Sequence, residues 1–285
     1  MDVHVRAAET SDGKVCGQIC YEAFAAVAER HGFPPDFVSI GDATDVVSAF
    51  IAHPGFFSAV AEEEGTVVGS NFLDARSSIF SIGPVTVDPT LQNRGVGTEL
   101  MRAVLGECLR RAAPGVRLVQ VAYNTASMSL YVRLGFDVRE QLVAMQGPPL
   151  NVAIPEYLVR FARPEDLEPC NRLCSEVHGH DRSGELQDAI ASTTAQVVER
   201  HSRITGYCTA IGLFGHAVAE TNDDLYALIG AAAGFSRAGF LVPMRNTDLL
   251  RWCLRQRLRA VYTANLMTVG VYQQPRGPYL ASIGY

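Results

Sequence analysis

The residues of this chain that could perform chemistry gather in one short segment, where an apolar strand runs into two closely spaced glycines. The strand ends at Asp88-Pro89, and Gly95 and Gly97 stand at the predicted start of a helix. Unpaired backbone N–H groups cluster at a helix N-terminus, and the helix dipole adds partial positive charge there. Glycines leave these groups accessible to a ligand, and Arg94 adds a full positive charge. The segment therefore predicts an anion site, suited to a pyrophosphate.

The glycine pattern by itself leaves the ligand open. A Gly-x-Gly after a strand is in many proteins only a tight turn. The segment has neither the three glycines of the dinucleotide fingerprint nor the Gly-Lys-Ser/Thr of a P-loop. A second stretch, from Asn124 to Phe136, narrows the choice.

Together the two stretches resemble the GNAT superfamily of N-acyltransferases. Gln92-Asn93-Arg94-Gly95-Val96-Gly97 is similar to the family's coenzyme A signature, Gln/Arg-x-x-Gly-x-Gly/Ala, which follows a Val-x-Pro strand end. The second stretch is similar to Asn-x-x-Ala-x-x-Leu-Tyr-x-x-x-Gly-Phe, with Ser127 in place of the alanine. Both motifs come in the family's order, and the resemblance covers residues 3–146.

The resemblance implies acetyl-CoA as the cosubstrate and no metal. The sheet would splay between its fourth and fifth strands, and the pantetheine arm would lie in that gap. The pyrophosphate would contact the run from Gln92 to Thr98. The coenzyme-binding residues expected from the resemblance are Val85, Val87, Gln92, Asn93, Arg94, Gly95, Val96, Gly97, Thr98, Asn124 and Tyr131.

The family's reaction is a direct transfer within a ternary complex, in which an amine attacks the thioester carbonyl and the thiolate leaves. Such a reaction benefits from an acid near the sulfur and a base near the amine. Tyr131 matches the family's position for the acid, with a packing tyrosine as the alternative. Asn124 would bond the pantetheine or a water, or simply cap a helix.

The general base is not identified by the sequence, and an amine of low pKa needs none. The candidates are Glu62, Glu63, Glu64, Glu22 and His31.

Hydrophobic periodicity and turn residues predict the elements that must position these motifs. Strands are expected at residues 3–8, 56–62, 66–75, 78–88, 117–123 and 136–145. Helices are expected at residues 13–31, 43–52, 126–134 and from Gly95 to before Pro114. This order gives an α/β (α+β) class with a mixed central sheet, which in the family is twisted, mostly antiparallel and flanked by helices.

The second half of the chain echoes the first. At an offset of 154, Arg6 matches Arg160 and Asp12 matches Asp166, and the pair Cys16 and Cys20 matches Cys170 and Cys174. At a shorter offset of 122, Asn124-Thr125 is echoed by Asn246-Thr247, and each pair opens a predicted helix. The pattern indicates an internal duplication. We therefore predict a GNAT-like coenzyme domain at residues 1–147 and a degenerate copy at 153–285.

The second copy is predicted to have lost the coenzyme site. After a strand expected at 206–218 come Glu220, Asp223 and Asp224, which stabilise a helix start but would repel a pyrophosphate. The counterpart of the tyrosine is Cys253, which is expected to be a core thiol, and His216 is expected to be structural. We expect this half, with its tail around Tyr279 to Tyr285, to help wall the acceptor pocket.

Composition excludes several other classes. The 285 residues carry a net charge of −6, which gives no basis for nucleic-acid binding. No apolar run reaches the roughly 18 to 20 residues of a membrane span, and the start lacks a basic and apolar leader, so we expect a cytoplasmic protein. Seven cysteines, an odd number without a His or Cys cluster nearby, indicate buried thiols rather than disulfides or a metal site.

The sequence thus predicts an N-acetyltransferase that moves an acetyl group from acetyl-CoA to the amine of a small molecule or peptide. The identity of this acceptor is not readable, and a homodimer stays open. A non-catalytic acyl-CoA sensor or interaction protein is the alternative from another class. A third interpretation is a C-terminal half that binds an unrelated ligand on which the N-terminal half reports.

Overall fold

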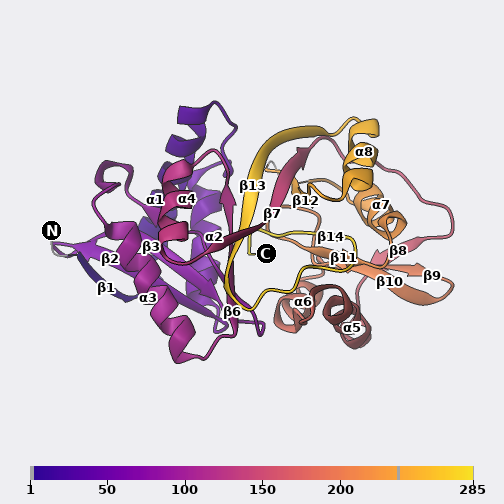
Figure 1. The fold of residues 1–285 in the computed structure, drawn as a ribbon, viewed down its shortest axis with the longest axis horizontal. Helices are drawn as coiled ribbons and strands as arrows, with labels where there is room; N and C mark the ends of the chain where they lie inside the picture. The colour runs from indigo at the N-terminus through magenta and orange to yellow at the C-terminus, as the bar shows by residue number, and fades with distance from the viewer. Residues whose placement is uncertain (1–2, 236–237, 285) are drawn as a thin grey trace.

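A nine-stranded sheet crosses the centre of the computed structural model, which describes residues 3–235 and 238–284 (Figure 1). Its strand order is β1-β2-β3-β4-β6-β13-β7-β12, and β5 pairs with β3. Only β4 and β6 run parallel, so the sheet is mixed and mostly antiparallel, as predicted. The strands are β1 (Val3–Ala7), β2 (Phe56–Glu63), β3 (Thr66–Asp74), β4 (Phe80–Ile82), β5 (Thr86–Val87), β6 (Gly115–Val121), β7 (Asp137–Gln146), β12 (Phe240–Pro243) and β13 (Arg259–Gly270).

Helices cover both faces of this sheet because successive residues of its strands point to opposite sides. Val60 of β2 packs with α1 and α2, whereas the neighbouring Ala59 and Ala61 pack with α3. The helices and short 3-10 turns of this half are α1 (Gly13–His31), α2 (Ile40–Ala52), α3 (Val96–Arg110), α4 (Thr125–Arg133), η1 (Thr10–Asp12) and η2 (Pro89–Leu91).

The fourth strand of the family's sheet is divided in this chain. One strand was expected over 78–88, but β4 and β5 are separate, because Gly83 has φ +136° and Pro84 has no N–H to donate. β4 pairs with β6 at Phe80 and Ser81, whereas β5 pairs only with β3 among the described strands. The sheet therefore splays between β5 and β6, which confirms the expected gap.

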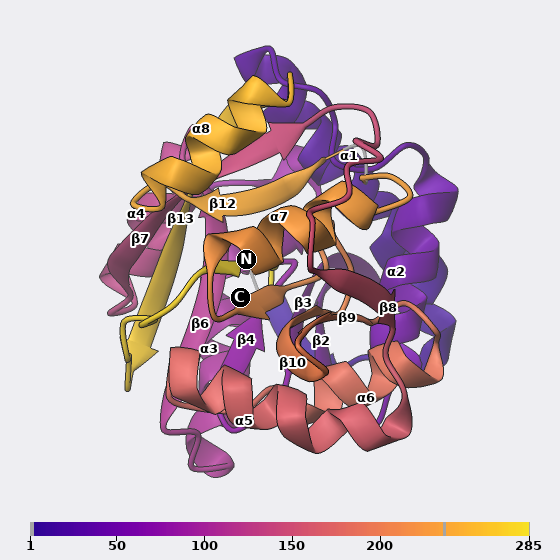
Figure 2. The ribbon, with the colours of Figure 1, turned by 90° about the vertical axis from the view of Figure 1, so that its right-hand side faces the viewer.

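The second sheet has five strands, in the order β14-β11-β10-β9-β8. Val197 of β9 packs with α5 and α6, and Val198 packs with α7 on the other face (Figure 2). The strands are β8 (Leu158–Phe161), β9 (Gln196–Arg200), β10 (Arg203–Cys208), β11 (Ala217–Ala219) and β14 (Tyr279–Leu280). The helices are α5 (Leu167–His178), α6 (Ser183–Ala191), α7 (Asn222–Ala231) and α8 (Thr247–Arg255), with the turn η3 (Pro164–Asp166). The single strand expected at 206–218 is wrong, because a loop from 209 to 216 separates β10 from β11.

The two halves repeat one ion-pair arrangement. Arg6 binds Asp12 at 2.7 Å and Glu62 at 2.6 Å. Arg160 binds Asp166 at 2.6 Å and Glu199 at 2.5 Å. Both guanidinium groups thus tie a first strand to the start of a first helix and to the second strand, which gives the sequence echo a structural counterpart.

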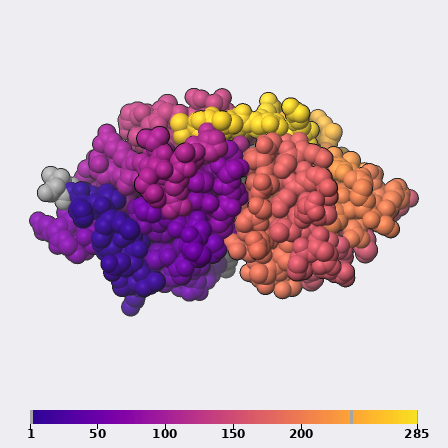
Figure 3. Space-filling view, turned by 90° about the horizontal axis from the view of Figure 1, so that it is seen from below, coloured from indigo at the N-terminus to yellow at the C-terminus, as the bar shows by residue number. Residues whose placement is uncertain are grey.

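The two halves also exchange strands. β13 belongs to the second half by sequence, yet it lies between β6 and β7 and pairs with both (Figure 1). The yellow C-terminal residues extend over both halves in the space-filling view (Figure 3). The division into residues 1–147 and 153–285 stays a prediction, and the nine-stranded sheet crosses it.

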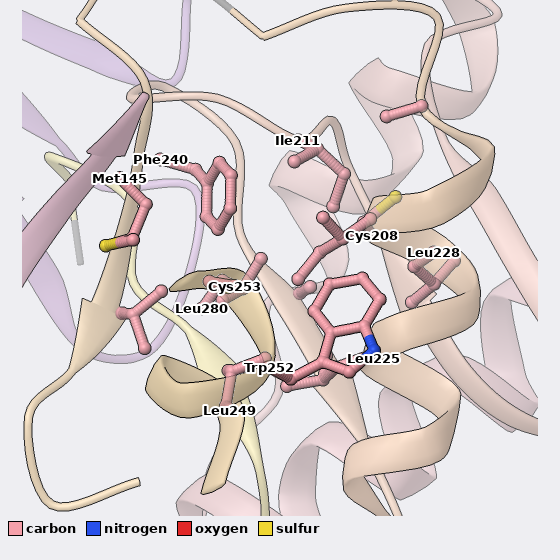
Figure 4. Packing of buried hydrophobic residues seen from close by; sticks show 14 of the residues in the cluster. Met145, Cys208, Ile211, Leu225, Leu228, Phe240, Leu249, Trp252, Cys253 and Leu280 are labelled. Carbon is pink, nitrogen blue, oxygen red and sulfur yellow. The ribbon is translucent and has the colours of Figure 1, made fainter. Parts of the chain in front are cut away.

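The hydrophobic core of the second half is shared in the same way. Figure 4 shows Met145 of β7 and Leu280 of β14 beside Trp252 and Cys253 of α8. Trp252 also stacks on Tyr226 of α7, with ring centroids 4.5 Å apart. All seven cysteines are free and buried, which confirms that they are core thiols. Among the described residues, no helix has the length and apolar character to cross a membrane, and no group of three or more His, Cys, Asp or Glu side chains could hold a metal.

Candidate active site

A groove of about 480 Å³ lies at the splay of the nine-stranded sheet, between β5, the start of α3, α1 and α4. We call it the coenzyme groove. Of the residues predicted to bind the coenzyme, those that line it are Val85, Val87, Gln92, Asn93, Gly95, Val96, Gly97, Thr98, Asn124 and Tyr131. The Arg94 side chain is exposed and is not part of the lining, so its contact with a coenzyme stays a prediction.

The start of α3 presents backbone N–H groups to the groove. Gly95 is the N-cap of α3 with φ +94°, and its carbonyl accepts the N–H groups of Thr98 at 2.9 Å and Glu99 at 3.2 Å. The N–H groups of the preceding residues have no acceptor within the helix. Val96 and Gly97 line the groove, so these donors are available to a phosphate.

Two arginines that the sequence did not single out also line the coenzyme groove. Arg30 comes from the last turn of α1, and Arg133 comes from the last turn of α4. Both residues are exposed, as groups that contact phosphates of a bound coenzyme must be. Nothing in the sequence indicates that these two helix ends meet the glycines, because their approach depends on how the helices pack.

Replacing Gly95 by valine should weaken the binding of acetyl-CoA by about tenfold or more, on the order of 1.4 kcal/mol. A β-branched residue is strained at φ +94°, and its side chain would stand at the helix start that faces the groove. Isothermal calorimetry measures the effect. Gly106→Val, at an exposed position in the middle of α3 with an open space around it, is the matched control. Equal affinity of both variants would show that the helix start does not bind the coenzyme.

Tyr131 and Asn124 lie at the inner end of the coenzyme groove. The Tyr131 side chain is 8% exposed, and burial raises its pKa to about 12, so the hydroxyl keeps its proton at neutral pH. Asn124 caps α4, because its Oδ1 accepts the N–H of Ser127 at 3.2 Å. The capping role foreseen as an alternative is therefore present, and the residue lines the groove as well.

A smaller cavity of about 110 Å³ continues inward from this point, and we call it the junction cavity. It shares Val85, Val121, Asn124 and Tyr131 with the coenzyme groove. The second half of the chain closes its far wall. The residues that it supplies are Leu213, Leu241, Tyr262, Ala264 and Ile283.

A third space of about 110 Å³ adjoins the junction cavity, and we call it the phenylalanine cavity. The two share Asp36, Pro84 and Ile283 among their lining residues. Five phenylalanines form much of its wall, namely Phe24, Phe37, Phe50, Phe56 and Phe214. Of the expected tail, Ser282, Ile283 and Gly284 reach this wall, while Tyr285 lies outside the described residues.

Asp36 is a titratable residue of these cavities that the sequence analysis did not identify, and no charged side chain of the described residues pairs with it. It lines both the junction cavity and the phenylalanine cavity, from the loop between α1 and α2. Tyr262 donates its hydroxyl to Asp36 Oδ1 at 3.4 Å. Burial raises the pKa of Asp36 to about 6 despite this hydrogen bond. The sequence holds no signal for it except the Pro34-Pro35 break, which marks a loop.

The five candidates for a general base named from the sequence line neither the groove nor the two cavities in the described part of the chain. Glu62 is bound by Arg6 at 2.6 Å, and Glu22 accepts a hydrogen bond from Gln18 at 3.0 Å. Glu63 and Glu64 stand at the β2–β3 turn. His31 packs on Tyr123, with ring centroids 5.2 Å apart.

In the second half, the chain itself fills the place that corresponds to the coenzyme groove. β14 pairs with β11 through Tyr279 and Leu280, and Ala281 bridges to Leu241 of β12. This tail satisfies the backbone groups that an open splay would offer to a pantetheine. The following helix, α7, is capped by Thr221 and the buried Asp224.

The part of the chain that forms this site is similar to a known family. Residues 23–136 match the model of the acetyltransferase (GNAT) family. The mycothiol acetyltransferase of Mycolicibacterium gilvum (strain PYR-GCK) is 36% identical over 90 residues, and this match spans only 30% of the chain and 30% of that relative.

Two solved structures share the fold along nearly the whole chain. A candidate acetyltransferase from Pyrococcus horikoshii has a TM-score of 0.77 at 18% identity, covering 97% of this chain and 92% of that one. A GCN5-related N-acetyltransferase from Sphaerobacter thermophilus has a TM-score of 0.62 at 15% identity, covering 95% and 96%. At these identities, the likeness concerns the fold alone.

Proposed function

We propose that this chain, whose N-terminal half belongs to the GNAT acetyltransferase family, transfers the acetyl group of acetyl-CoA to an amine. The proposal is supported above all by the fact that the coenzyme groove and the junction cavity adjoin and share lining residues. The coenzyme groove, with a helix start suited to anions at one end, meets the junction cavity at Tyr131 and Asn124. A coenzyme and an acceptor could thus approach one another from opposite sides.

The coenzyme would be held by backbone and by charge. The pyrophosphate fits the N–H groups at the start of α3, and Arg30 and Arg133 add positive charge to the same groove. The pantetheine arm fits along Val85 to Val87, where the described strands leave the edge of β5 toward β6 unpaired. Gln92 donates a hydrogen bond to the Val87 carbonyl at 3.4 Å and so ties the turn to this strand.

The transfer itself needs one proton delivered and one removed. The amine nitrogen attacks the thioester carbonyl carbon, a C–N bond forms, and the C–S bond breaks. The Tyr131 hydroxyl gives its proton to the departing thiolate, for which its position between the groove and the junction cavity is suited. The raised pKa of Tyr131 keeps that proton available until the thiolate develops.

Replacing Tyr131 by phenylalanine should lower kcat by roughly 10²-fold and leave the affinity for acetyl-CoA nearly unchanged, because only the proton donor is lost. Release of free thiol from acetyl-CoA, measured with a panel of primary amines, gives the rate, and calorimetry gives the affinity. Tyr226→Phe, on α7 and stacked on Trp252, is the matched control.

Two outcomes would count against the proposal. A Tyr131→Phe variant with full activity would reduce Tyr131 to a packing residue. A wild-type chain that binds acetyl-CoA but does not consume it in the presence of any amine of the panel would favour the non-catalytic sensor instead.

A further inference from the structure

Asp36 is a half-buried carboxylate whose charge is not balanced by a cation among the described residues around it. No cationic side chain of the described residues forms an ion pair with it, and its hydrogen-bond partner is the neutral hydroxyl of Tyr262. A carboxylate removed from water without a cation is costly, so such groups are usually paired. Asp36 therefore lacks a positive partner, and it faces two cavities.

The loop that carries Asp36 is held rigidly on both sides. Phe33 stacks on Tyr123, with ring centroids 4.4 Å apart, and meets Tyr262 edge-on at 6.0 Å. Phe37 packs edge-on against Phe24 at 5.7 Å. Aromatic pairs of this geometry fix the rings against each other. The carboxylate is thus positioned toward the cavities by its neighbours, including Tyr262 from the second half of the chain.

The other charges of the phenylalanine cavity are already paired. Arg76 binds Asp74 at 2.5 Å and Asp188 at 2.7 Å. Arg182 binds Glu185 at 2.5 Å. These two guanidinium groups are neutralised by carboxylates and offer little to an anionic ligand. The remaining wall is dominated by the five phenylalanines.

The size of the cavities limits the ligand. Each holds about 110 Å³, and they adjoin at Asp36 and Pro84. A cavity of roughly 150 Å³ accepts a benzene ring, so the two together can hold a single ring or a short alkyl chain. A longer polar chain would bury polar atoms against phenyl rings without partners.

We propose that the acceptor is a small primary amine on an apolar, preferably aromatic body, with Asp36 binding its ammonium group and taking its proton. The proposal rests on the proposed acetyl transfer and names the acceptor of the same site. The ammonium would lie in the junction cavity, between Asp36 and the position of the thioester near Tyr131. The apolar body would lie among the phenylalanines, whose ring faces also attract a cation.

Asp36, Tyr131 and water account for every proton in the reaction, and Asp36 releases its proton to solvent at the end of the cycle. Asp36 accepts one proton from the ammonium, which leaves a neutral amine with a free electron pair. That nitrogen forms the amide bond and loses a second proton to solvent as the tetrahedral adduct collapses. The thiolate takes the proton of Tyr131, which is then restored from water. Acetyl-CoA and an ammonium ion thus yield an amide, the free thiol and one proton.

The test compares three probes with acetyl-CoA and the full chain, namely 2-phenylethylamine, ethylamine and phenylalanine. The value of kcat/KM for 2-phenylethylamine should exceed that for ethylamine by about tenfold to a hundredfold, the gain from burying a phenyl ring. Phenylalanine should be a poor substrate, because its carboxylate would meet an acidic, apolar wall. Equal values for the three probes would overturn the proposal, as would a preference for a peptide with N-terminal phenylalanine.

Variants then assign the roles. Asp36→Asn should lower kcat/KM for 2-phenylethylamine by roughly 10²-fold without changing the affinity for acetyl-CoA, and Asp36→Glu should recover part of the loss. Asp45→Asn, exposed on α2, is the matched control. Phe214→Ala should raise KM for 2-phenylethylamine but not for ethylamine, whereas Phe161→Ala, exposed on β8, should change neither. A fully active Asp36→Asn variant would refute the assignment.

The pH profile gives a further readout. Tyr262, Tyr123 and Cys20 are the titratable groups that act on Asp36, and burial raises the pKa of each, so they stay neutral near pH 6. With a pKa of about 6, Asp36 is protonated below that pH, and kcat/KM should fall there in the wild type but not in Asp36→Asn. If no amine is acetylated, the proposed function fails. Calorimetry of 2-phenylethylamine binding to the wild type and to Asp36→Asn then still tests the acceptor site, and equal affinities would reject it.

Discussion

A fragment of residues 1–150 is expected to remain unfolded and to bind no acetyl-CoA, although it contains every motif of the coenzyme groove. Without β13, both β6 and β7 lose their partner in the middle of the nine-stranded sheet. Their backbone groups would be left without hydrogen bonds, and the buried Leu266 and Met267 would leave the core. Circular dichroism and calorimetry on the fragment check this result.

A point variant in the full chain makes the same test without truncation. Leu266→Ala should lower the free energy of unfolding by about 2 to 5 kcal/mol, because Leu266 is fully buried in β13. Thr263→Ala, exposed on the same strand, should have a small effect. A folded 1–150 fragment with the full chain's affinity for acetyl-CoA would show that β13 is dispensable. If that fragment also acetylated 2-phenylethylamine with unchanged kcat/KM, the second half would have no part in the acceptor pocket.

Replacing Glu185 by glutamine should lower the free energy of unfolding by about 3 to 5 kcal/mol at neutral pH. Glu185 binds Arg182 at 2.5 Å and His216 Nδ1 at 2.9 Å, and all three side chains are at most 11% exposed. Because an ionised carboxylate only accepts, Nδ1 of His216 carries the proton, and Nε2 accepts from the Tyr207 hydroxyl at 2.9 Å. The glutamine would remove the negative charge that lies 2.5 Å from Arg182 in this buried network.

The effect should depend on pH in a defined direction. Burial alone would raise the pKa of Glu185, but the charge of Arg182 and the hydrogen bond from His216 outweigh it and hold this pKa well below the ordinary value near 4.5. A carboxyl group with a lowered pKa in the folded state stabilises the fold above its unfolded pKa and loses that contribution as the pH falls. Thermal unfolding should therefore separate the wild type from Glu185→Gln at pH 7, and the difference in stability should begin to shrink below about pH 4.5 and vanish only well below that pH.

The control for this variant lies on the neighbouring helix. Glu168→Gln removes an exposed carboxylate of α5 that pairs with Arg172 at 3.5 Å, a surface pair that contributes little. If the two glutamine variants were equally stable, the Glu185 network would contribute no more to the free energy of unfolding than an exposed surface pair.

Much of the local structure follows from the sequence by itself. The spans of α1 and α3 and the caps at Asn124 and Asn246 agree with expectation, because periodicity, capping side chains and glycine conformations act over a few residues. The anion-binding start of α3 belongs to the same class, since Gly95 needs only its own φ of +94°. The ten lining residues foreseen for the coenzyme groove come from two such local motifs.

Strand limits were less predictable, because a strand is defined by its partners. One strand was expected over residues 78–88, yet β4 pairs with both β3 and β6, whereas β5, after Gly83-Pro84, pairs with β3 alone among the described strands. The stretch 206–218 is interrupted in the same way before β11 begins. A pattern of period two shows which residues point to one face, but not which strand lies beside them.

Only the tertiary structure decided the rest of the site. The insertion of β13 between β6 and β7 joins residues more than a hundred positions apart. The same packing turns Arg30 and Arg133 toward one groove and sets Tyr262 against Asp36. In the second half, it lets β14 fill the gap that in the first half stays open. The glycine motif and the helix caps could be predicted from the sequence because they depend on interactions between neighbouring residues. The candidate base and the wall of the acceptor site arise from contacts between distant segments, which no local pattern encodes.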